Sequence, residues 1–588
     1  MPLIVQKFGG TSVADCEKIL AAARKAIRAQ QEGNQVVMVV SAMGKNTDML
    51  VDLAGQITER PPAREMDMLL STGEQVSVAL MAMAIDSLGF RAVSLTGAQI
   101  GIRTDSTHTK ARILSISTDR LQRHLDAGSI VIAAGFQGID EEFNITTLGR
   151  GGSDTTAVAL AAVLQADACE IHTDVDGVYT TDPRIMPEAR RVSRVSYDEM
   201  LELASLGAGV MHSRSIEFAK KFSVPIHVRS SFSDIPGTMI VSDPERPDKA
   251  VSGAALTRDE ARITASGVPD IPGTSFEIFS RIAEKNVSVD MIVQNIGDGG
   301  QADISFTVPR NELAVTLDAV QDAQQELGSF EVTHDDQVAK VSVVGQGMAT
   351  QSGIADQMFG ALSAAKINIQ MITTSEIKIS ALVEREQALA ALRVVHNAFE
   401  LDQEPTQIPE LVADLKTGGD AVDIVRQLQD MERLRIDRIE LDGSQGRVTI
   451  HGVPNAPGVA ERVFQEIAAA GIFVDMIVQS YPIGGEANLS FTVPKAAVID
   501  SQTVAENLTD AFPSLRITSS PDVAKLSVSG IGLRSHTGVA IRMFRALSDA
   551  KINVEMINTS EVRVNVVVDG ADGETARDAL LQVFDDVM

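Results

Sequence analysis

Residues 289–295 read VDMIVQN, and 185 residues later the chain repeats the stretch as VDMIVQS at 474–480. Other stretches return at the same displacement: SFTVP at 305–309 and 490–494, and AAKINIQMITTSE at 364–376, which becomes DAKINVEMINTSE at 549–561. A displacement that stays constant over this length leaves no room for gaps between the copies. The second part of the chain is therefore an internal duplication.

Each copy holds two smaller units. In each unit a strand leads through a glycine-bearing turn to a helix, then to two strands, a second helix and a last strand. This order is the ferredoxin-like pattern. A solenoid of stacked repeats is the alternative, but two copies are too few for one. The expected units span 250–335, 336–403, 435–520 and 521–588, with a connector at 404–434.

The first part of the chain follows a different pattern, in which short β-rich runs alternate with helical ones. The expected strands are Leu3–Phe8, Gln35–Ser41, Ile130–Ala134 and Glu170–Thr173, and the expected helices are Ala14–Arg28, Met66–Leu88 and Thr155–Leu164. Strand and helix in alternation predict a mainly parallel sheet that helices cover on both faces. We therefore expect one three-layer α/β domain over residues 1–245.

Composition limits the classes of function. The 588 residues include 51 Lys and Arg against 79 Asp and Glu, a formal net charge of −28, which repels nucleic acids and anionic membranes. Neither the two cysteines nor His108, His124, His172 and His212 show metal-ligand spacing. The N-terminus lacks a signal-peptide pattern, and no apolar run reaches the ~18 residues of a membrane span. We expect a cytoplasmic protein without a structural metal site.

A glycine pair near the N-terminus is the first candidate site. Lys7 stands near the end of the first expected strand, just before Gly9 and Gly10 and a helix start. Glycines let backbone N–H groups approach a phosphate, and a helix N-terminus favours an anion. The motif is not a Walker sequence, so a tight turn with a Ser/Thr cap is an equal alternative on spacing alone.

A second glycine-rich turn, Arg150-Gly151-Gly152-Ser153-Asp154, precedes the third expected helix. A helix start capped by Ser153 or Asp154 is one interpretation. Arg150 favours another, because a cap needs no cation, whereas a guanidinium binds a carboxylate through two hydrogen bonds. Two basic, glycine-rich turns suggest two anionic ligands that face each other.

A third candidate, the segment from Thr173 to Arg184, leaves the carboxyl end of an expected strand, where open α/β sheets bind ligands. Its Asp-Gly and Asp-Pro steps are first of all turn signals. Glu74 lies on the long expected helix, where a lone glutamate is most often solvated.

Together these stretches resemble those of aspartokinases, enzymes of the amino-acid-kinase fold that phosphorylate the side-chain carboxylate of L-aspartate. The resemblance covers the chain and rests on six stretches in family order: VQKFGGTSVA at 5–14, SAMGKNTD at 41–48, STGEQ at 71–75, TTLGRGGSDTTAVALA at 146–161, TDVDGVYTTDPR at 173–184 and VRSSFS at 228–233. The repeated units resemble ACT domains, the amino-acid-sensing modules of such kinases. Two are usual in the family, and the duplication implies four here.

The resemblance implies a role for each motif residue. Lys7 and Asp154 would be the catalytic pair around the transferred phosphoryl group. The aspartate-binding residues implied are Ser41, Thr47, Glu74, Arg150, Gly151, Gly152 and Ser153. The ATP-binding residues implied are Lys7, Gly9, Gly10, Thr173, Asp174, Tyr179 and Arg184, with Mg²⁺ accompanying the nucleotide. Arg150 would hold the α-carboxylate of aspartate and Glu74 its α-ammonium.

The ACT resemblance implies lysine and threonine as feedback effectors, and a homodimer formed through ACT domains. The effector residues implied in the first copy are Asp270, Gly273, Thr274, Ser275, Ser288, Asp290, Gln294, Gly353, Ile354, Asn368, Ile369, Ser375 and Glu376. Those in the second copy are Asn455, Gly458, Val459, Ala460, Phe473, Asp475, Gln479, Gly538, Val539, Asn553, Val554, Ser560 and Glu561.

The spacing within VDMIVQN supports an effector site on that strand. Asp290 and Gln294 share parity, so on a regular strand both side chains point the same way. By resemblance, Asp290 and Asp475 would accept an ammonium group of the bound amino acid. A buried core strand with a capping interaction at Asp290 is the alternative.

Other functions fit parts of the pattern. Gly209 stands where family members often have a lysine that contacts the nucleotide.

A catalytically inactive amino-acid sensor, and a kinase acting on glutamate or N-acetylglutamate, are the alternatives to an aspartokinase. Lys7, Glu74, Arg150 and Asp154 together argue against a sensor, and a contact between Glu74 and an ammonium argues against an acetylated substrate. The implied product, 4-phospho-L-aspartate, leads towards lysine (through diaminopimelate), threonine and methionine.

Overall fold

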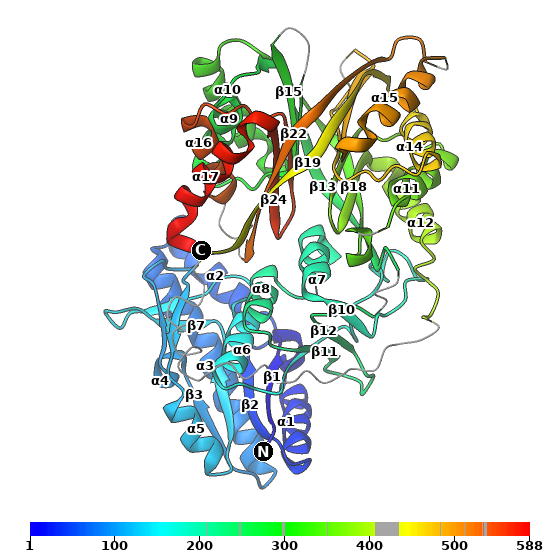
Figure 1. Ribbon diagram of the computed structural model, residues 1–588. Coiled ribbons are helices and arrows are strands. Elements are labelled where there is room, and N and C mark those ends of the chain that lie inside the picture. Colours follow the sequence, from blue (N-terminus) through cyan, green and yellow to red (C-terminus); the bar gives the residue numbers. More distant parts are fainter. Residues whose placement is uncertain are drawn as a thin grey trace.

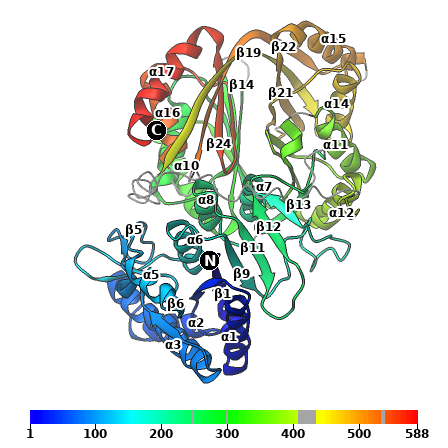
Figure 2. The same cartoon turned by 60° about the horizontal axis from the view of Figure 1, so that its bottom comes forward.

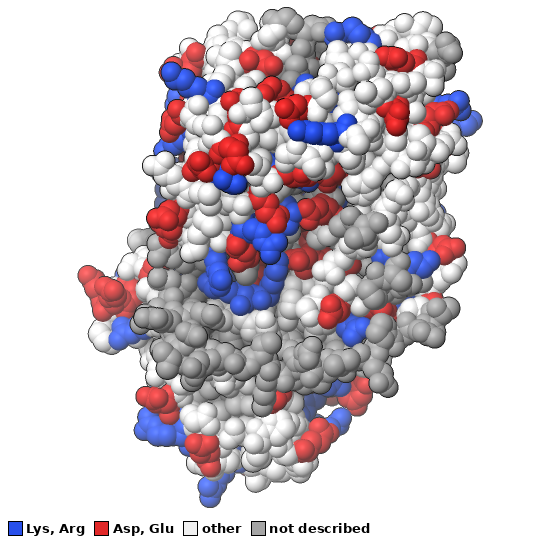
Figure 3. All heavy atoms as spheres, viewed as in Figure 1, with Lys and Arg blue, Asp and Glu red and all other residues white. Residues whose placement is uncertain are grey.

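The computed structural model describes residues 1–588 apart from 209, 246–248, 297–299, 350, 406–433, 483, 511, 532 and 534–537. An α/β domain lies against a second body made of four smaller units (Figure 1). Acidic and basic side chains are interspersed over the face shown in Figure 3. Gly209 and nearly all of the connector predicted at 404–434 lie outside the described residues.

The α/β domain is built on an eight-stranded sheet in which neighbouring strands run parallel, except that β12 runs antiparallel to β11. In spatial order the strands are β10 (Arg194–Ser196), β12 (Thr238–Val241), β11 (Ile226–Ser230), β9 (Ala168–Thr173), β1 (Leu3–Phe8), β2 (Gln35–Val40), β6 (Ile130–Ala134) and β3 (Ala92–Leu95). The carboxyl ends of parallel strands lie at one edge of a sheet, which is where the candidate site residues follow β1, β2 and β9.

Helices cover both faces of this sheet, as predicted. On one face Phe8 and Met38 share a core with α1 (Cys16–Gln31) and α3 (Ala63–Ser87). On the other face Val5 and Val39 share a core with α6 (Gly152–Val163). The other helices of the domain are α2 (Asn46–Ile57), α4 (Gly97–Ile100), α5 (Asp119–Asp126), α7 (Tyr197–Leu203) and α8 (Ser213–Lys221), with the short turns η1 (Gly10–Val13) and η2 (Ala204–Ala208).

Helix α3 joins this sheet to a smaller one. The small sheet consists of β5 (Ile113–Ile116), β4 (Ile102–Thr104), β7 (Gln137–Ile139) and β8 (Ile145–Thr147), and β8 contacts α3. Among the described residues α3 is the one helix long and apolar enough to cross a membrane, although half of its most apolar stretch is buried in the fold. Because α3 also buries Asp67 and Glu74, we interpret it as a core helix.

All three predicted helices begin at other residues than the sequence pattern predicts, and α3 begins at Ala63 instead of Met66. α1 begins at Cys16 instead of Ala14, because the Asp15 side chain accepts a hydrogen bond from the Lys18 backbone N–H (2.9 Å). α6 begins at Gly152 instead of Thr155, directly after Gly151, whose φ is 74°. The earlier start places Ser153 and Asp154 inside the first turn of the helix.

In its described residues the second body contains one twelve-stranded sheet with eight helices around it. In spatial order its strands are β14 (Asp290–Ile296), β15 (Gln301–Pro309), β13 (Gly253–Pro269), β16 (Glu331–Val344), β18 (Lys378–Glu384), β17 (Met371–Ser375), β20 (Ile477–Gln479), β21 (Glu486–Pro494), β19 (Arg435–Pro454), β22 (Arg516–Ile531), β24 (Arg563–Asp569) and β23 (Met556–Thr559). The helices are α9 (Thr274–Glu284), α10 (Leu313–Leu327), α11 (Ile354–Ala364), α12 (Ala388–Ala398), α14 (Val459–Ala469), α15 (Val498–Asn507), α16 (Gly538–Asp549) and α17 (Gly573–Phe584).

The two units of each copy exchange a strand, which the sequential division of the chain did not anticipate. Residues 253–257, the start of β13, pair with residues 340–344 of β16 and complete the second unit of the first copy. The remainder of β13 pairs with β15 inside the first unit. Division at 335 therefore leaves the second unit one strand short. The second copy does the same, because the start of β19 pairs with the end of β22.

The units pair across the copies, first with fourth and second with third. β17 of the second unit hydrogen-bonds antiparallel to β20 of the third, with Ile372 opposite Gln479. β14 of the first unit contacts β23 of the fourth. Figure 1 shows the result: α9 and α10 lie beside α16 and α17, and α11 and α12 beside α14 and α15. One junction is therefore a hydrogen-bonded strand pair and the other a packing contact, and both lie within one chain.

A pseudo-twofold axis relates the two copies. Met291, Met371, Met476 and Met556, one from each unit, are buried in a shared central cluster, and each copy contributes two of them at the 185-residue displacement. Asn558 Nδ2 donates to Thr373 Oγ1 (3.3 Å), and these residues occupy the same position in the two copies. Contact between equivalent residues places the axis between them.

Ending the chain at Gln403 tests this pairing. The fragment keeps two complete units, because the exchanged strand at 253–257 lies within the first copy. It also exposes both apolar surfaces that the second copy covers. We expect fragments to pair through these surfaces, so light scattering should give twice as many subunits per particle as the full chain gives.

A control variant separates this pairing from other association. Met371→Asp in the fragment puts a charge at the centre of the new interface and should return the particle to the subunit number of the full chain, with unchanged secondary structure. A fragment that keeps the subunit number of the full chain would contradict the pairing.

Candidate active site

The residues predicted for catalysis and aspartate binding line one cleft at the carboxyl ends of β1 and β2. The cleft encloses about 780 Å³ of solvent-open space. Its lining consists of Lys7, Gly9, Gly10, Ser41, Ala42, Gly44, Thr47, Glu74, Phe136, Gly149, Arg150, Gly151, Gly152, Ser153 and Asp154. β1, β2, α2, α3 and α6 thus bring together every member of that predicted set.

Lys7 and Asp154 form an ion pair in this cleft. Lys7 Nζ lies 2.6 Å from Asp154 Oδ1, and each side chain is 12% exposed. Lys7 comes from β1 and Asp154 from the first turn of α6, so the pair joins the strand to the helix that covers it. A largely buried cation at a cleft wall can stabilise negative charge that develops on a ligand.

The N-terminus of α6 opens onto the cleft without a side-chain cap. Its N-cap is Gly151, and no side chain accepts a hydrogen bond there, so capping by Ser153 or Asp154 is wrong. A Cβ on Gly151 would lie 2.4 Å from the Cβ of His212, and one on Gly152 would lie 2.8 Å from Phe136 Cδ2. Only glycine fits this turn, and backbone N–H groups of a buried helix face the cleft.

The first glycine turn differs from its prediction in one respect. The turn leads into the four-residue η1 and not directly into α1. The N-terminus of α1 is capped by the Asp15 side chain, so its backbone N–H groups do not face the turn. Gly10 is needed for another reason: a Cβ there would lie 2.9 Å from the carbonyl oxygen of Ala42. The turn can therefore approach the end of β2 closely, and Gly44 N–H donates to the Gly10 carbonyl (3.0 Å).

Glu74 is buried, contrary to the expectation for a lone glutamate on a helix. Its side chain is 4% exposed, and Oε1 accepts a hydrogen bond from the Ala42 backbone N–H (3.0 Å). Oε2 has no hydrogen-bond partner among the described residues. Burial raises the pKa of Glu74 to about 7, against the opposing effect of the Ala42 N–H. A buried carboxylate with one open oxygen is suited to an ammonium group.

Arg150 lies at the mouth of the cleft and is exposed. Within the described part of the chain, no ion pair engages it. Ser41 and Thr47 also line the cleft, after β2 and at the start of α2 respectively. The cleft therefore offers a free guanidinium at its rim and a carboxylate at its base.

Of the residues predicted for the nucleotide, Lys7, Gly9 and Gly10 line this cleft, whereas Thr173, Asp174, Tyr179 and Arg184 lie on a segment beside it. Thr173 ends β9, and the neighbouring His172 carbonyl accepts the Gly9 N–H (3.4 Å), so this segment adjoins the first glycine turn. Thr173 Oγ1 donates to Asp174 (3.1 Å), and Tyr179 OH donates to Asp176 (2.9 Å). Arg184 is exposed and pairs with Asp182 (2.7 Å).

Four residues of the cleft lining were not predicted from the sequence: Ala42, Gly44, Phe136 and Gly149. Phe136 has a φ of 71°, a left-handed conformation that costs a bulky residue energy and is found most often at functional sites. Its ring packs on Gly152, and Gly135 before it allows contact with Ser153. The run GFQG at 135–138, directly after a buried strand, was the available signal.

The predicted effector residues gather at four junctions between units. One junction joins the first unit to the fourth: Asn553 Nδ2 donates to Asp270 Oδ1 (2.8 Å), and Gln294 Nε2 donates to the Val554 carbonyl (2.6 Å). This junction holds Asp270, Gly273, Thr274, Ser275, Gln294, Asn553 and Val554. Its equivalent between the third and second units holds Asn455, Gly458, Val459, Ala460, Gln479, Asn368 and Ile369.

The other two junctions lie on the opposite ends of the same unit pairs. A pocket between the first and fourth units is lined by Ser288, Asp290, Ser560 and Glu561 among others, and Gly538 and Val539 adjoin it. The equivalent pocket between the second and third units is lined by Gly353, Ile354, Ser375 and Asp475, next to Glu376 and Phe473. Sequence reasoning selected these residues but did not predict which units meet.

The predicted common orientation of Asp290 and Gln294 is wrong. Met291 has a φ of 46°, and β14 carries a bulge between Asp290 and Val293, which reverses the side-chain alternation. The Asp290 carboxylate is bound by Lys340, which also lies 3.0 Å from Glu260. Burial lowers the pKa of Lys340, but the two carboxylates outweigh this and raise it. Asp475 pairs with Lys525 in the same way, so both carboxylates already have a cation.

Replacing Glu74 with glutamine tests its environment. The Glu74 pKa is about 7 in the folded chain and 4.5 as the reference value. The folded state therefore binds this proton more tightly, and the parent loses stability as pH rises from about 4.5 to 7. The loss is about 3 kcal/mol in the free energy of unfolding.

Glu74→Gln has no such proton and should escape this loss. Urea denaturation at pH 5 and pH 8 measures the effect, and the parent should weaken relative to the variant at the higher pH. Parallel pH profiles for the two proteins would show that Glu74 is solvated like an ordinary surface glutamate.

Comparison with family models divides the chain in the same way as the structure. Residues 2–230 match the model of the amino acid kinase family. Residues 262–324, 341–399, 448–512 and 526–584 each match the ACT domain model.

Curated relatives are similar over about two thirds of the chain. The aspartate kinase of Stutzerimonas stutzeri is 53% identical over 404 residues, which are 68% of this chain and 98% of the relative. The aspartokinase of Pseudomonas aeruginosa is 52% identical over 405 residues, again 68% of this chain and 98% of the relative. These lengths correspond to the α/β domain and one copy of the duplication.

Solved structures extend the similarity to the whole chain. An aspartate kinase from Synechocystis is 41% identical with a TM-score of 0.53, and the match covers 99% of this chain and 98% of that one. E. coli aspartokinase III in complex with aspartate and ADP is 26% identical with a TM-score of 0.56, covering 67% and 99%. The same enzyme in complex with lysine and aspartate is 26% identical with a TM-score of 0.55, covering 68% and 99%.

Proposed function

The chain belongs to the aspartokinase family, and we propose that its cleft binds L-aspartate between Glu74 and Arg150 and ATP beside the Gly9–Gly10 turn. The reaction transfers the γ-phosphoryl group of ATP to the side-chain carboxylate of aspartate, and it yields ADP and 4-phospho-L-aspartate. The observation that carries the proposal is the open Oε2 of the buried Glu74 in the same cleft as Lys7.

Three charges of aspartate match three groups of the cleft. Its α-ammonium satisfies Glu74, and its α-carboxylate binds the Arg150 guanidinium through two hydrogen bonds. With both groups on the α-carbon held, the side-chain carboxylate points towards Lys7. An acetylated amine carries no charge and would leave Glu74 buried without a cation, which argues against N-acetylglutamate as the substrate.

Phosphoryl transfer here needs positioning and charge stabilisation more than proton transfer. The attacking carboxylate is already an anion, so no general base is required. Lys7 stabilises the charge that spreads over the transferred group, while Asp154 fixes the Lys7 ammonium through their ion pair. Backbone N–H groups of Gly10 and the start of α6 add dipoles at the same place.

The nucleotide brings its own Mg²⁺ in this proposal. The described residues contain no group of three or more His, Cys, Asp or Glu side chains that could hold a metal ion. This fits Mg²⁺, which is commonly held by phosphate oxygens, water and one or two carboxylates. When bound, the ion neutralises phosphate charge. Thr173, Asp174, Tyr179 and Arg184 are the proposed nucleotide contacts on the segment after β9.

Arg150→Lys tests the orientation of aspartate. Lysine keeps the positive charge but loses the planar pair of donors. We expect the KM for aspartate to rise by about ten-fold or more, whereas the KM for ATP should change little. Steady-state kinetics in both substrates measures the two constants. A larger change in the KM for ATP would move Arg150 to the nucleotide side of the cleft.

Lysine and threonine are the proposed feedback effectors, and the four junctions between ACT units are their proposed sites. A solved relative, E. coli aspartokinase III, is known in complex with lysine and aspartate. The two copies offer unequal sites, because Asp270 of the first junction is replaced by the neutral Asn455 at its equivalent. Sites of different charge suit two effectors of different charge. The proposed enzyme acts in the cytoplasm on the route to lysine, threonine and methionine.

A buried ion pair connects these junctions to the kinase domain. Lys378 Nζ, on β18 of the second unit, lies 2.8 Å from Glu202 Oε2 on α7, and both side chains are almost fully buried. Glu202 Oε1 also accepts the backbone N–H of Glu561 from the fourth unit (3.1 Å). Burial lowers the pKa of Lys378, but Glu202 and other carboxylates outweigh this and raise it. Figure 2 shows α7 where the two bodies meet.

The contact is asymmetric, and this asymmetry provides a control. Arg563 occupies the position of Lys378 in the second copy, and it pairs with Glu376 instead of a kinase residue. We propose that movement at the junctions reaches the kinase domain through Glu202, and allosteric coupling of this kind is typically worth about 1–3 kcal/mol.

Removing both charges at once tests the coupling without leaving either charge unpaired. In the double variant Glu202→Leu with Lys378→Met, activity without effectors should stay near that of the parent, while the lysine and threonine concentrations for half inhibition should rise about five-fold or more. Arg563→Met should shift them less. Equal inhibition of the double variant and the parent would exclude the Glu202 route.

A further inference from the structure

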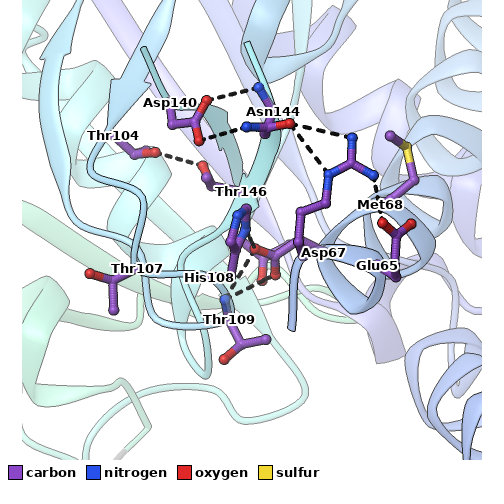
Figure 4. Close-up of polar contacts among 12 residues, drawn as sticks. Glu65, Asp67, Met68, Thr104, Thr107, His108, Thr109, Asp140, Asn144 and Thr146 are labelled. Atoms are coloured by element: carbon purple, nitrogen blue, oxygen red, sulfur yellow. Dashed lines mark hydrogen bonds and ion pairs between the residues drawn. The ribbon is translucent and has the colours of Figure 1, made fainter. Parts of the chain in front are cut away.

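Asp67 is a buried carboxylate on α3 that the proposed mechanism does not use. It lies two helical turns before Glu74 and is 0% exposed. Figure 4 shows His108 and Thr109 converging on it from a neighbouring loop. His108 Nδ1 lies 2.7 Å from Oδ2, and the Thr109 N–H donates to both oxygens at 3.0 and 3.1 Å. Thr147 Oγ1 donates to Oδ1 at 2.5 Å.

The Thr109 N–H and the Thr147 hydroxyl donate to Asp67, and His108 Nδ1 donates as well in the ring form that carries a proton there, so a carboxylate can accept from each of them. An asparagine at 67 would direct an NH₂ group at one of the donors. The arrangement therefore requires Asp67 as a carboxylate and not merely as a polar side chain.

One partner of Asp67 belongs to the segment that carries Arg150, and the others lie on a loop that packs on that segment. Thr147 ends β8, two residues before Gly149. The loop of His108 and Thr109 packs on the same segment: Ala111 N–H donates to the Thr147 carbonyl (2.9 Å), and the Thr109 carbonyl lies 2.9 Å from where a Gly149 Cβ would stand. Asp67 thus fixes both the end of β8 and the loop that supports it.

Arg214 holds this segment from another direction. Its Nη1 donates to the Leu148 carbonyl (2.5 Å) and its Nη2 to the Ala111 carbonyl (2.7 Å). The backbone from Thr147 to Gly149 is therefore tied down on both sides, and Arg150 follows it directly. Arg150 has no ion pair of its own among the described residues, so the residues before it set its position at the rim of the cleft.

We propose that Asp67 and His108 are positioning residues for aspartate. Helix α3 carries Asp67 and Glu74 on one rigid element, and Asp67 ties that element to the segment of Arg150. The distance between the group that holds the α-ammonium and the group that holds the α-carboxylate is thereby fixed. The inference rests on the proposed roles of Glu74 and Arg150, and it adds the residues that set their spacing.

Kinetics of Asp67 and His108 variants test the inference in the full chain. Asp67→Asn and His108→Ala should each raise the KM for aspartate by about ten-fold or more, because a buried hydrogen bond is lost. The KM for ATP and the kcat at saturating aspartate should stay within about three-fold of the parent. His108→Asn should keep an aspartate KM near that of the parent, because its amide N–H can replace the ring Nδ1–H as donor to Asp67.

Thr146→Val is the matched control. Thr146 neighbours Thr147 on β8 and shares a buried hydroxyl contact with Thr104 (2.6 Å), away from Asp67 (Figure 4). The Thr146→Val substitution removes a hydrogen bond from the same strand and should leave the aspartate KM unchanged. Should Asp67→Asn fail to fold, the pair His108→Ala and His108→Asn decides the matter, since both keep Asp67.

Two outcomes would overturn the inference. One is an aspartate KM within two-fold of the parent in Asp67→Asn and His108→Ala. The other is a parallel loss of kcat and of affinity for both substrates, which indicates general destabilisation. Arg150→Lys separates this failure from that of the proposed function: if it raises the aspartate KM while Asp67→Asn does not, only the positioning role is wrong, and if it does not, the Arg150 assignment fails.

Discussion

A buried carboxylate needs a hydrogen-bond donor or a cation as a partner, and the kind of partner distinguishes the roles of the buried acidic residues in this chain. Asp67 is surrounded by hydrogen-bond donors, and Glu202 is paired with a lysine from the neighbouring body. Glu74 differs from both, because one of its oxygens has no protein partner among the described residues and burial has raised its pKa. The first two therefore hold the structure in place, whereas the third is open to a cationic ligand, and the substrate pocket is arranged around it.

The regulatory body obeys a second constraint, which is that an open strand edge binds another strand. Duplication supplies β17 with a hydrogen-bonded partner strand, β20, inside the same chain, and β14 packs against β23. The resulting body has pseudo-twofold symmetry, but the kinase domain contacts it unequally. Glu202 binds Lys378 of one copy, while the equivalent Arg563 pairs with Glu376. Two copies of similar sequence can therefore affect the kinase domain to different extents.

The local motifs were predictable from sequence, whereas the long-range pairings were not. Lys7, Arg150 and Asp154 lie in contiguous motifs whose backbone conformation is set by neighbouring glycines, so their convergence on one cleft could be expected. The exchange of residues 253–257 between units depends on which strand edges meet, and no local pattern encodes that. The predicted orientation of the Asp290 side chain was wrong for a different reason. The left-handed conformation of Met291 reverses the alternation of side chains along a strand that looks regular in sequence. The burial of Glu74 likewise depends on Ala42, a residue 32 positions away in sequence.

Calorimetry of aspartate binding without ATP tests the central claim that Glu74 receives the α-ammonium. With a pKa of about 7, Glu74 is mostly protonated at pH 6 in the empty cleft, and an ammonium ligand requires the ionised form. Titrations in two buffers of different ionisation enthalpy give the number of protons released. This account predicts a release approaching one proton at pH 6, falling towards zero above pH 8, and absent in Glu74→Gln. Binding that releases no proton at pH 6 would contradict it.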